Sequence, residues 1–450
     1  MRSEKVREAE KQWKKVLKTA GTAAVVDQFK GLQQDMLDKK FLMKGKPFPT
    51  FMKPYFIEAD LMKYLGHTTQ VIMNAVEKVG DLFFSNTEYE KYFEMNPLDL
   101  ELAKINPRYP RRVINGRLDA FLQETKEGPD LKFLEFNCDS PCGMGWHDQL
   151  IGMIQQLPVY KEFLSGFGGR FEPIVPSLQK GLRTKSREFG NPEDSNFAVL
   201  CWDDSTVHYD LELVASYMDK AGQKAFWADN RDCSYDGKTL KMNGKPVGLV
   251  FRDAIQEFTE DMVKTKPVLD AYKDGKVCLV NPFSSRIEGL KCVLWFMTDP
   301  ISSHLFNEEE RKVIFDTIPW TRFMHQSKTD YRGKKVDLFE FVRKNRVKMV
   351  LKPNAGYGGF GVTIGKETTP EKWDQVIEQC AKAPWVVQEF VAIPNEQFPL
   401  VGDEVVWSKK NVNINFFAHD GLFGGGYVRI SDSSIINIHQ GGGLVPICYI

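Results

Sequence analysis

The segment VLKPNAGYGGFGVTIG, Val350 to Gly365, decides how the rest of the chain is interpreted. It begins with apolar residues, continues with a glycine-rich stretch and ends with GVTIG, which again has the composition of a strand. This pattern predicts a strand, a flexible flap and a second strand. Glycines let backbone N–H groups approach phosphate oxygens, and Lys352 precedes the flap. The segment is therefore a candidate phosphate lid.

Three other kinds of phosphate loop do not fit the residues around these glycines. Gly356, Gly358 and Gly361 spell GxGxxG, but a dinucleotide fold needs a helix after the third glycine, and a strand-like sequence follows here. A Walker loop needs Lys and then Ser or Thr after its last glycine. A protein kinase needs HRD and DFG sequences, which do not occur. An idle glycine-rich turn beside a solvated Lys352 stays open at this point.

The composition is that of an ordinary globular protein. The 450 residues are 42% hydrophobic and 12% aromatic, enough for large apolar cores in two or three domains. Lys plus Arg and Asp plus Glu number 60 each, so no overall charge favours nucleic acid or an anionic membrane as partner. We expect small-molecule ligands.

The sequence lacks the signals of export and of membrane insertion. The first 20 residues carry charges throughout and no apolar core, and no later stretch reaches the roughly 18 apolar residues of a membrane span. The eight cysteines are scattered and form no CxxC pair, which argues against a disulfide framework and against zinc. We expect a cytoplasmic protein.

The first two of four predicted segments contain helices and one β-hairpin. Residues 1–100 carry apolar side chains at helical spacing, for example Trp13 and Leu17, and are expected to form an N-terminal helical region. Residues 101–190 are expected to contain a β-hairpin, RRVINGRLDAFLQE and LKFLEFN around the turn KEGPD, followed by connecting helices.

The last two segments give a fold class that mixes α/β and α+β. Residues 191–300 alternate strands and helices like a small α/β domain, with a polar hairpin through DGKTLKMNGKPVGLVF. Residues 301–450 are expected to hold a polar linker around 325–335, the flap, a helix near 369–381, the strand WVVQEFV and a C-terminal hairpin.

Polar residues occupy alternate positions in the predicted hairpin of residues 101–190. Arg117 and Asp119 are two residues apart, and so are Glu135 and Asn137. Because alternate residues share one face of a strand, each pair projects to one side. With a turn centred near Glu127, Asp119 lies opposite Glu135 and Arg117 lies opposite Asn137. The four polar groups then form one patch.

This patch is a candidate cation site. Leu134 and Phe136 are expected to point to the opposite face. Carboxylates facing each other at Asp119 and Glu135 repel unless a cation lies between them, and Mg²⁺ prefers oxygen ligands completed by phosphates and water. Arg117 is placed to neutralise charge on a transferred group. A solvated hairpin face is the other interpretation, but the glycine- and proline-rich loop CDSPCGMGW that follows favours a site.

Together these motifs carry a family resemblance. GRLD, FLEFNCDSP, the lysine that ends NPFSSRIEGLK, VLKP with its glycines and VVQEFV occur in that order. In this combination the chain resembles glutathionylspermidine synthase and its relatives, the circularly permuted ATP-grasp ligases, over roughly residues 105–446. The resemblance implies an ATP-grasp fold with an α/β pre-ATP-grasp-like domain. In this interpretation, segments 101–190 and 301–450 contribute the metal hairpin and the nucleotide lid.

The resemblance also implies roles for individual residues. Arg117 matches the catalytic arginine, and the Mg²⁺ ligands would be Asp119, Glu135 and Asn137. The ATP site would comprise the lysines Lys291 and Lys352, the flap glycines Gly358 and Gly359, and the strand residues Gln388, Glu389, Phe390 and Val391. Substrate contacts would come from Ser140. Arg252 and Arg429 are assigned more loosely to substrate or phosphate, because each is an arginine at the end of a predicted strand near these motifs.

The implied activity is ATP-dependent ligation of a carboxylate to an amine through an acyl phosphate, with release of ADP and phosphate. A small-molecule kinase that stops after the first step, and a non-catalytic nucleotide-binding protein, are the alternatives. Bifunctional family members carry a cysteine-histidine amidase domain, but the first 100 residues here contain no cysteine and only His67, so that activity is expected to be absent. The flap NAGYGGFG is less charged than that of the synthase, and the substrates are not inherited.

Overall fold

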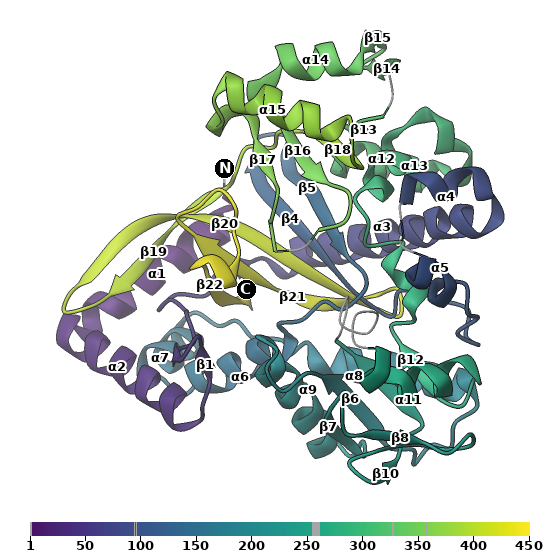
Figure 1. Cartoon of the computed structure of the whole chain (residues 1–450). Coiled ribbons are helices and arrows are strands. Elements are labelled where there is room, and N and C mark those ends of the chain that lie inside the picture. The colour runs from purple at the N-terminus through teal and green to yellow at the C-terminus, as the bar shows by residue number, and fades with distance from the viewer. Residues whose placement is uncertain (1, 94, 96, 254–261, 326–327, 357) are drawn as a thin grey trace.

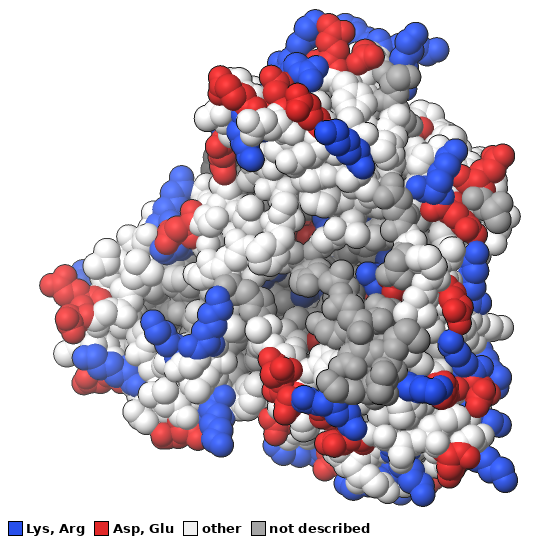
Figure 2. Space-filling view, in the orientation of Figure 1, with Lys and Arg blue, Asp and Glu red and all other residues white. Residues whose placement is uncertain are grey.

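The computed structural model describes residues 2–450, apart from 94, 96, 254–261, 326–327 and 357. It is a mixed α/β structure with three sheets of four or more strands, one central, one above it and one below it in Figure 1. None of the helices in the described ranges is long and apolar enough to cross a membrane. Acidic and basic side chains are interspersed over the face shown in Figure 2.

The central sheet joins distant parts of the chain. Its strands follow the order β3-β22-β21-β20-β4-β5, and β19 pairs with the first half of β20. Their bounds are β3 (Tyr55–Ile57), β4 (Asn115–Thr125), β5 (Gly128–Asn137), β19 (Asn395–Val401), β20 (Val405–His419), β21 (Leu422–Ser431) and β22 (Gly443–Tyr449). The predicted β4–β5 and β20–β21 hairpins are confirmed, and they lie side by side because β4 pairs with β20.

The register of the β4–β5 hairpin is as predicted at the polar patch. Asp119 pairs with Glu135, and Arg117 pairs with Asn137. The expected orientation of Leu134 is wrong, because the next pair is Ala120 with Phe133 and Leu134 is the extra residue of a β-bulge. A bulge redirects the side chain and the carbonyl of the strand that carries it.

The upper sheet carries the flap. Its antiparallel strands, in the order β13-β18-β16-β17, are β13 (Thr321–Phe323), β16 (Met349–Pro353), β17 (Thr363–Ile364) and β18 (Trp385–Glu389). Helix α15 (Pro370–Cys380) begins after the N-cap Thr369 and buries Trp373, Val376 and Ile377 against this sheet and α14 (Leu338–Lys344). The two strands around the flap and the helix after them are therefore confirmed.

The polar linker predicted around 325–335 is wrong where the structure describes it. Strands β14 (Lys328–Tyr331) and β15 (Lys334–Asp337) form a hairpin there. Arg332 and Gly333 both have positive φ, of 51° and 80°, and such a two-residue turn suits the twist of paired strands. Residues 326–327 lie outside the described residues.

The lower sheet is parallel, in the order β12-β11-β6-β7. Its strands are β6 (Phe197–Cys201), β7 (Ala225–Asp229), β11 (Leu249–Arg252) and β12 (Cys278–Val280), accompanied by α8 (Val175–Phe189), α9 (His208–Lys220) and α11 (Met262–Lys273). The α/β prediction is confirmed. The expected hairpin is wrong in one part, because its last three residues, LVF, belong to β11. The polar strands are β8 (Cys233–Tyr235), β9 (Leu240–Met242) and β10 (Lys245–Pro246).

The N-terminal segment is mostly helical, as predicted. Its long helices are α1 (Glu4–Ala20), α2 (Thr22–Asp38) and α3 (Ala59–Ser85), followed by the short α4 (Glu90–Phe93) and α5 (Pro97–Ala103). Trp13 of α1 is fully buried and packs on Tyr160 of α7 (Pro158–Gly166) with ring centroids 4.7 Å apart. The prediction missed β1 (Leu42–Met43), β2 (Lys46–Pro47) and β3, which pairs with β22.

Three further helices complete the core near the sheets. These are α6 (Met144–Ile154), α12 (Cys292–Thr298) and α13 (Glu308–Thr317). Helix α12 is apolar and buried from Cys292 to Met297, and it packs on β13 and α3. Lys291 immediately precedes α12, so the buried helix fixes the position of the Lys291 backbone.

Candidate functional site

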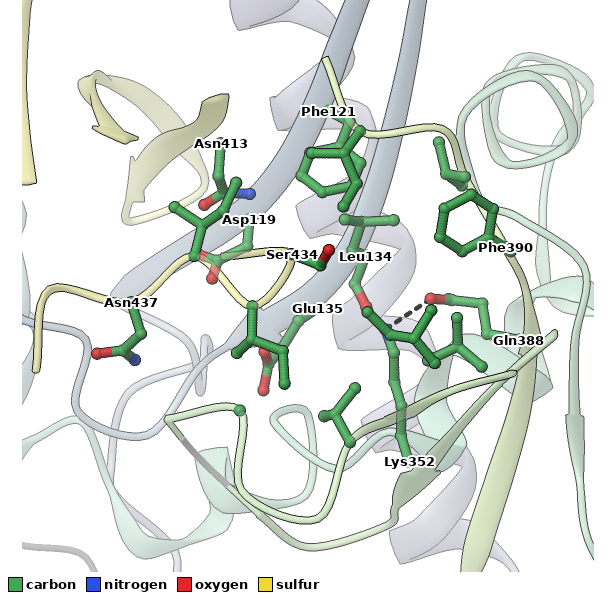
Figure 3. A pocket seen from close by; sticks show the side chains of 18 of the residues that line it. Asp119, Phe121, Leu134, Glu135, Lys352, Gln388, Phe390, Asn413, Ser434 and Asn437 are labelled. Carbon is green, nitrogen blue, oxygen red and sulfur yellow. Dashed lines mark hydrogen bonds between the residues drawn. The ribbon is translucent and has the colours of Figure 1, made fainter. Parts of the chain in front are cut away.

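The predicted site residues meet in a cavity of about 150 Å³ between the central and upper sheets. The β4–β5 hairpin forms one wall, β16 and β18 form a second, and the flap and the segment after β21 close it (Figure 3). Thirteen of the fifteen predicted residues line it, namely Arg117, Asp119, Glu135, Asn137, Lys291, Lys352, Gly358, Gly359, Gln388, Glu389, Phe390, Val391 and Arg429.

Asp119 is paired with two arginines. Arg117 Nε donates to Asp119 Oδ1 at 3.1 Å, and an Nη2 donor of Arg429 contacts Oδ2. Burial acts to raise the pKa of Asp119, but the guanidinium groups of Arg429 and Arg117 outweigh it and hold the pKa below its ordinary value. Asp119 is therefore a carboxylate at neutral pH.

Glu135 has a cationic partner of its own. Lys291 Nζ lies 3.0 Å from Glu135 Oε1, and it also donates to the main-chain oxygen of Gly356 at 2.7 Å. Lys291 thereby connects the hairpin to the first glycine of the flap. One ammonium group therefore contacts both the hairpin and the flap.

The oxygen atoms of the patch suit a hard divalent cation. Two carboxylates lie opposite each other. Asn137 donates a hydrogen bond from Nδ2 to Asp119 Oδ1 at 3.3 Å, so its amide oxygen points away from this carboxylate oxygen. Two carboxylates with an amide oxygen, completed by water and phosphate, match the usual protein share of a Mg²⁺ shell. Among the described residues there is no cluster of three or more His, Cys, Asp or Glu side chains that would hold a metal without such additional ligands.

Lys352 is held by two neutral oxygen atoms. Its Nζ donates to Gln388 Oε1 at 2.6 Å and to the main-chain oxygen of Leu134 at 3.0 Å, and only 8% of the residue is exposed. Burial lowers the pKa of Lys352 to about 8. The bond to Leu134 depends on the β-bulge and joins the upper sheet to the central one.

The glycines of the flap allow a close approach to the segment after β21. Gly358, Gly359 and Gly361 have φ of 67°, 78° and 75°, a region that suits glycine. A Cβ atom on Gly359 would lie 2.5 Å from Ile435 Cγ2. Gln440 Nε2 donates to the main-chain oxygen of Gly358 at 2.7 Å. The flap is thus seated against residues 435–440.

Several lining residues were missed by the sequence analysis. Asn413 of β20 lies in the wall, and its Oδ1 accepts hydrogen bonds from Arg429 at 2.8 and 3.2 Å. The alternation in NVNIN resembles that in GRLD and could have indicated it. Others are apolar or lie in the loop after β21, for which no local pattern exists, namely Phe121, Leu134, Val350, Val362, Ile364, Ile393, Ser434, Ile435, Ile436 and Asn437.

A second cavity of about 500 Å³ adjoins the first. The two share a wall made by Arg117, Asn137, Gly358, Arg429 and Asn437. The second cavity reaches the loops that follow β6 and β11 in the lower sheet. Those strands lie next to each other where the strand order reverses, and such a crevice is the usual ligand position of a parallel sheet.

Ser140 lines this second cavity, whereas Arg252 lies apart. Ser140 Oγ is buried and has no hydrogen-bond partner among the described residues. Arg252 is 1% exposed, donates to Asp139 and to the main-chain oxygen of Asn281, and lies over the Phe283 ring at 4.5 Å. Arg252 lines neither cavity, so the structure does not bring it together with the other predicted residues.

Comparison with solved structures gives a match along nearly the whole chain. A glutathione synthetase-like effector from Globodera pallida, in its apo form, superposes with a TM-score of 0.60 at 11% identity, covering 95% of this chain and 97% of that one. The two chains share a fold. At this identity the likeness concerns the fold alone.

Other structures match less well. A putative gamma-glutamylcysteine synthetase from Methylobacillus flagellatus has a TM-score of 0.44 at 10% identity, covering 88% of this chain and 90% of that one. A RimK domain ATP-grasp protein from Sphaerobacter thermophilus has a TM-score of 0.27 at 12% identity, covering 57% and 91%. No protein-family model matches the sequence, and neither does any curated protein sequence.

Proposed function

We propose that the protein is an ATP-dependent carboxylate-amine ligase of the ATP-grasp type. One observation carries the proposal: a small cavity lined by four basic side chains, two facing carboxylates and a glycine flap shares a wall with a larger cavity. A ligase that activates a carboxylate with ATP needs a polyphosphate site and a substrate site in direct contact. The shared fold with a glutathione synthetase-like protein is consistent with it.

In this proposal the first cavity binds ATP. Lys291, Lys352 and the backbone N–H groups of the flap hold the phosphates, because ammonium groups and amide donors neutralise the oxygen charge. Apolar side chains on either side of the upper-sheet strands form a slot for the base, among them Val350, Ile364, Phe390, Val391 and Ile393. Glu389 is fixed at the end of β18 by Tyr331 Oη at 2.9 Å and Arg332 at 2.8 Å.

Asp119, Glu135 and Asn137 would hold Mg²⁺, which would reduce the negative charge of the phosphates. The three residues come from one hairpin, so their spacing is set by strand pairing and not by a flexible loop. With the two carboxylates engaged by a cation, Arg117, Arg429 and Lys291 would be free to contact the phosphates.

The larger cavity takes the carboxylate and amine substrates. A carboxylate oxygen attacks the γ-phosphorus of ATP, the bond between that phosphorus and the β,γ-bridging oxygen breaks, and ADP leaves. The amine nitrogen then attacks the carbonyl carbon of the acyl phosphate, phosphate leaves with the former carboxylate oxygen, and the nitrogen loses a proton as the amide forms. Arg117, in the wall between the cavities, stabilises the charge that develops in both steps.

The flap has a protective role in this scheme. An acyl phosphate is hydrolysed by water, so closing the cavity over it favours amide formation. Ser140 Oγ, buried and without a partner among the described residues, is positioned to donate to the carboxylate substrate. We also propose that the ATP-grasp parts are circularly permuted, because the metal hairpin precedes the nucleotide strands in the sequence.

The test is a screen for stimulated turnover. The purified protein is mixed with ATP, Mg²⁺ and pools of amino acids, small peptides and polyamines, and phosphate release is followed, with mass spectrometry of the products. Ligation predicts phosphate and ADP together with an amide. A phosphorylated product without amide would identify a kinase, and ATP binding without turnover in any pool would identify a non-catalytic nucleotide-binding protein.

A matched pair of variants connects turnover to the site. Lys352→Met is expected to abolish phosphate release, because the phosphates lose one of two ammonium contacts. Lys372→Met, at an exposed position of α15 in the same part of the molecule, serves as the control and should retain full turnover. Equal turnover by the two variants would contradict the proposed site.

A further inference from the structure

Gln388 makes hydrogen bonds at both ends of its side-chain amide. Its Oε1 accepts from Lys352 Nζ at 2.6 Å, and its Nε2 donates to Thr321 Oγ1 at 3.1 Å. Thr321 Oγ1 in turn donates to the main-chain oxygen of Pro319 at 2.9 Å. Gln388 is 1% exposed and Thr321 is fully buried. The hydrogen bonds from Pro319 through Thr321 and Gln388 to Lys352 therefore form a continuous series that is shielded from water.

The direction of each bond in this chain is determined from both ends. A lysine ammonium can only donate, and a main-chain carbonyl can only accept. The Thr321 hydroxyl must therefore give its hydrogen to Pro319 and accept from Gln388, while the amide oxygen of Gln388 must face Lys352. The orientation of this amide, which is ambiguous in many proteins, has only one consistent solution here.

The strand pairing makes the arrangement rigid. Thr321 of β13 is directly opposite Gln388 of β18, and Gln388 is opposite Val350 of β16, two residues before Lys352. Side chains two residues apart lie on the same face of a strand, so the three polar residues form a diagonal row across adjacent strands. Figure 3 shows the last bond of this row, from the Lys352 ammonium to Gln388, inside the cavity.

We propose that Gln388 is a positioning residue for Lys352, and that it acts on the phosphates through this lysine and not on the base. The inference rests on the proposed function and refines it. Lys352 has three hydrogens, and Gln388 and Leu134 accept two of them, which leaves one direction for a phosphate oxygen. Because both acceptors are neutral, the full positive charge of the ammonium remains available to the ligand.

This arrangement explains why an amide and not a carboxylate occupies position 388. A glutamate would form an ion pair with Lys352 and would repel phosphate from the same place. An apolar residue would leave the ammonium with only the Leu134 carbonyl and with more freedom of rotation. Both changes weaken binding of phosphates, but for different reasons and to different extents.

The test separates phosphate contacts from base contacts. Binding of ATP and of inorganic tripolyphosphate, which has no base, is measured by calorimetry with Mg²⁺ present, for wild type, Gln388→Met and Gln388→Glu. We expect Gln388→Met to lower the affinity for both ligands by about tenfold, the usual effect of losing one hydrogen bond to a charged group. Gln388→Glu should weaken both further. Gln379→Met, at an exposed position of α15, is the matched control.

Thr321, the hydrogen-bond partner of Gln388, provides an independent variant. Thr321→Val removes the hydroxyl that orients Gln388, so we expect a smaller loss for both ligands, while Thr321→Ser keeps the hydroxyl and should restore binding. Where Gln388→Met fails to fold in a thermal melt, Thr321→Val and Thr321→Ser carry the same comparison.

The outcomes distinguish this inference from the proposed function. Weakening of ATP with unchanged tripolyphosphate would show that Gln388 contacts the base, and would overturn the inference while leaving an ATP site in place. Unchanged binding of both ligands in Gln388→Met and Thr321→Val would also overturn it. No binding of ATP by the wild-type protein would overturn the proposed function and the inference together.

Discussion

Asp119 and Glu135 lie directly opposite each other across the β4–β5 hairpin, yet each carboxylate is paired with a different cation. Asp119 contacts Arg117 and Arg429, whereas Glu135 contacts Lys291. Two like charges at paired positions of a sheet destabilise it unless each is compensated. These pairs stabilise the hairpin without a metal, and they are also the pairs that a bound metal would replace.

Replacing Glu135 by glutamine tests this exchange. We expect Glu135→Gln to lose most of the Mg²⁺-dependent gain in ATP affinity, at least tenfold, because one of two carboxylate ligands is gone. Affinity for ATP in EDTA should be kept or increased, since Lys291 no longer has an acidic partner. Titrations with and without Mg²⁺ measure both effects. Glu127→Gln, at the exposed tip of the same hairpin, is the control, and an unchanged Mg²⁺ effect in Glu135→Gln would contradict the site.

The titration of Lys352 predicts a pH dependence with opposite signs for binding and stability. Burial lowers its pKa from 10.5 to about 8, so the folded protein loses this proton at a lower pH than the unfolded chain. Between about pH 8 and 10.5 the unfolded chain binds more protons, and this group therefore makes the free energy of unfolding rise with pH. ATP affinity should fall over the same interval, because the ammonium becomes neutral.

Lys352→Arg checks this pH prediction, because arginine keeps its charge throughout the interval. We expect ATP affinity measured in EDTA from pH 7 to 9.5 to decline in wild type and to vary much less in the arginine variant. Denaturant melts over the same pH range supply the stability part. Parallel curves for the two proteins would exclude Lys352 as the titrating group.

Gly359 is expected to be sensitive to the addition of a single methyl group. Gly359→Ala imposes a side chain at φ 78° and places its Cβ against Ile435, so the flap must move or strain at a cost of about 1–3 kcal/mol. ATP affinity should fall severalfold, and proteolytic cleavage within the flap should become faster. Gly356→Ala, whose Cβ would make only ordinary contacts, is the matched control.

A double variant separates the two causes. Ile435→Ala removes the atom that the new methyl group meets but does not change the backbone requirement. The loss caused by Gly359→Ala should therefore be smaller in the Ile435→Ala background than in wild type. Equal losses in the two backgrounds would show that backbone conformation alone is responsible.

Arg252 should matter for stability and not for ligand binding. Removing one partner of a buried ion pair usually costs about 3–5 kcal/mol, because the other charge is left uncompensated. Arg252→Met leaves Asp139 without its guanidinium partner, so we expect a lower melting temperature with ATP affinity of the folded protein within about twofold of wild type. A stable Arg252→Met variant with greatly weakened ATP binding would show that Arg252 contributes to the ligand site.

The sequence predicted the parts of the site that depend on local periodicity. The pairing of Asp119 with Glu135 follows from the alternation of two polar pairs around a short turn, and the structure has this register. The bulge at Leu134 was not predictable, because an extra residue in a strand requires no special local sequence. Its result, a carbonyl turned toward Lys352, was missed with it.

The remaining omissions concern contacts between distant residues. Tyr55 of β3 pairs with Ile447 of β22, and neither strand shows the alternation of a half-buried strand, because both are buried on both sides. The loop that holds Ile435 against the flap is defined only by what it touches. Arg252 was assigned from its position at a strand end, which does not reveal that Asp139 lies beside it.

The carbonyl of Leu134 has a consequence for how this protein tolerates mutation. The acceptor that receives the Lys352 ammonium belongs to the main chain, so no substitution at position 134 deletes it. Random point changes there alter the packing of a side chain but keep the hydrogen bond between the two sheets. Among changes in β5 itself, the loss or gain of a residue would remove it, so the acceptor side of this link is robust to substitution and vulnerable to deletions and insertions.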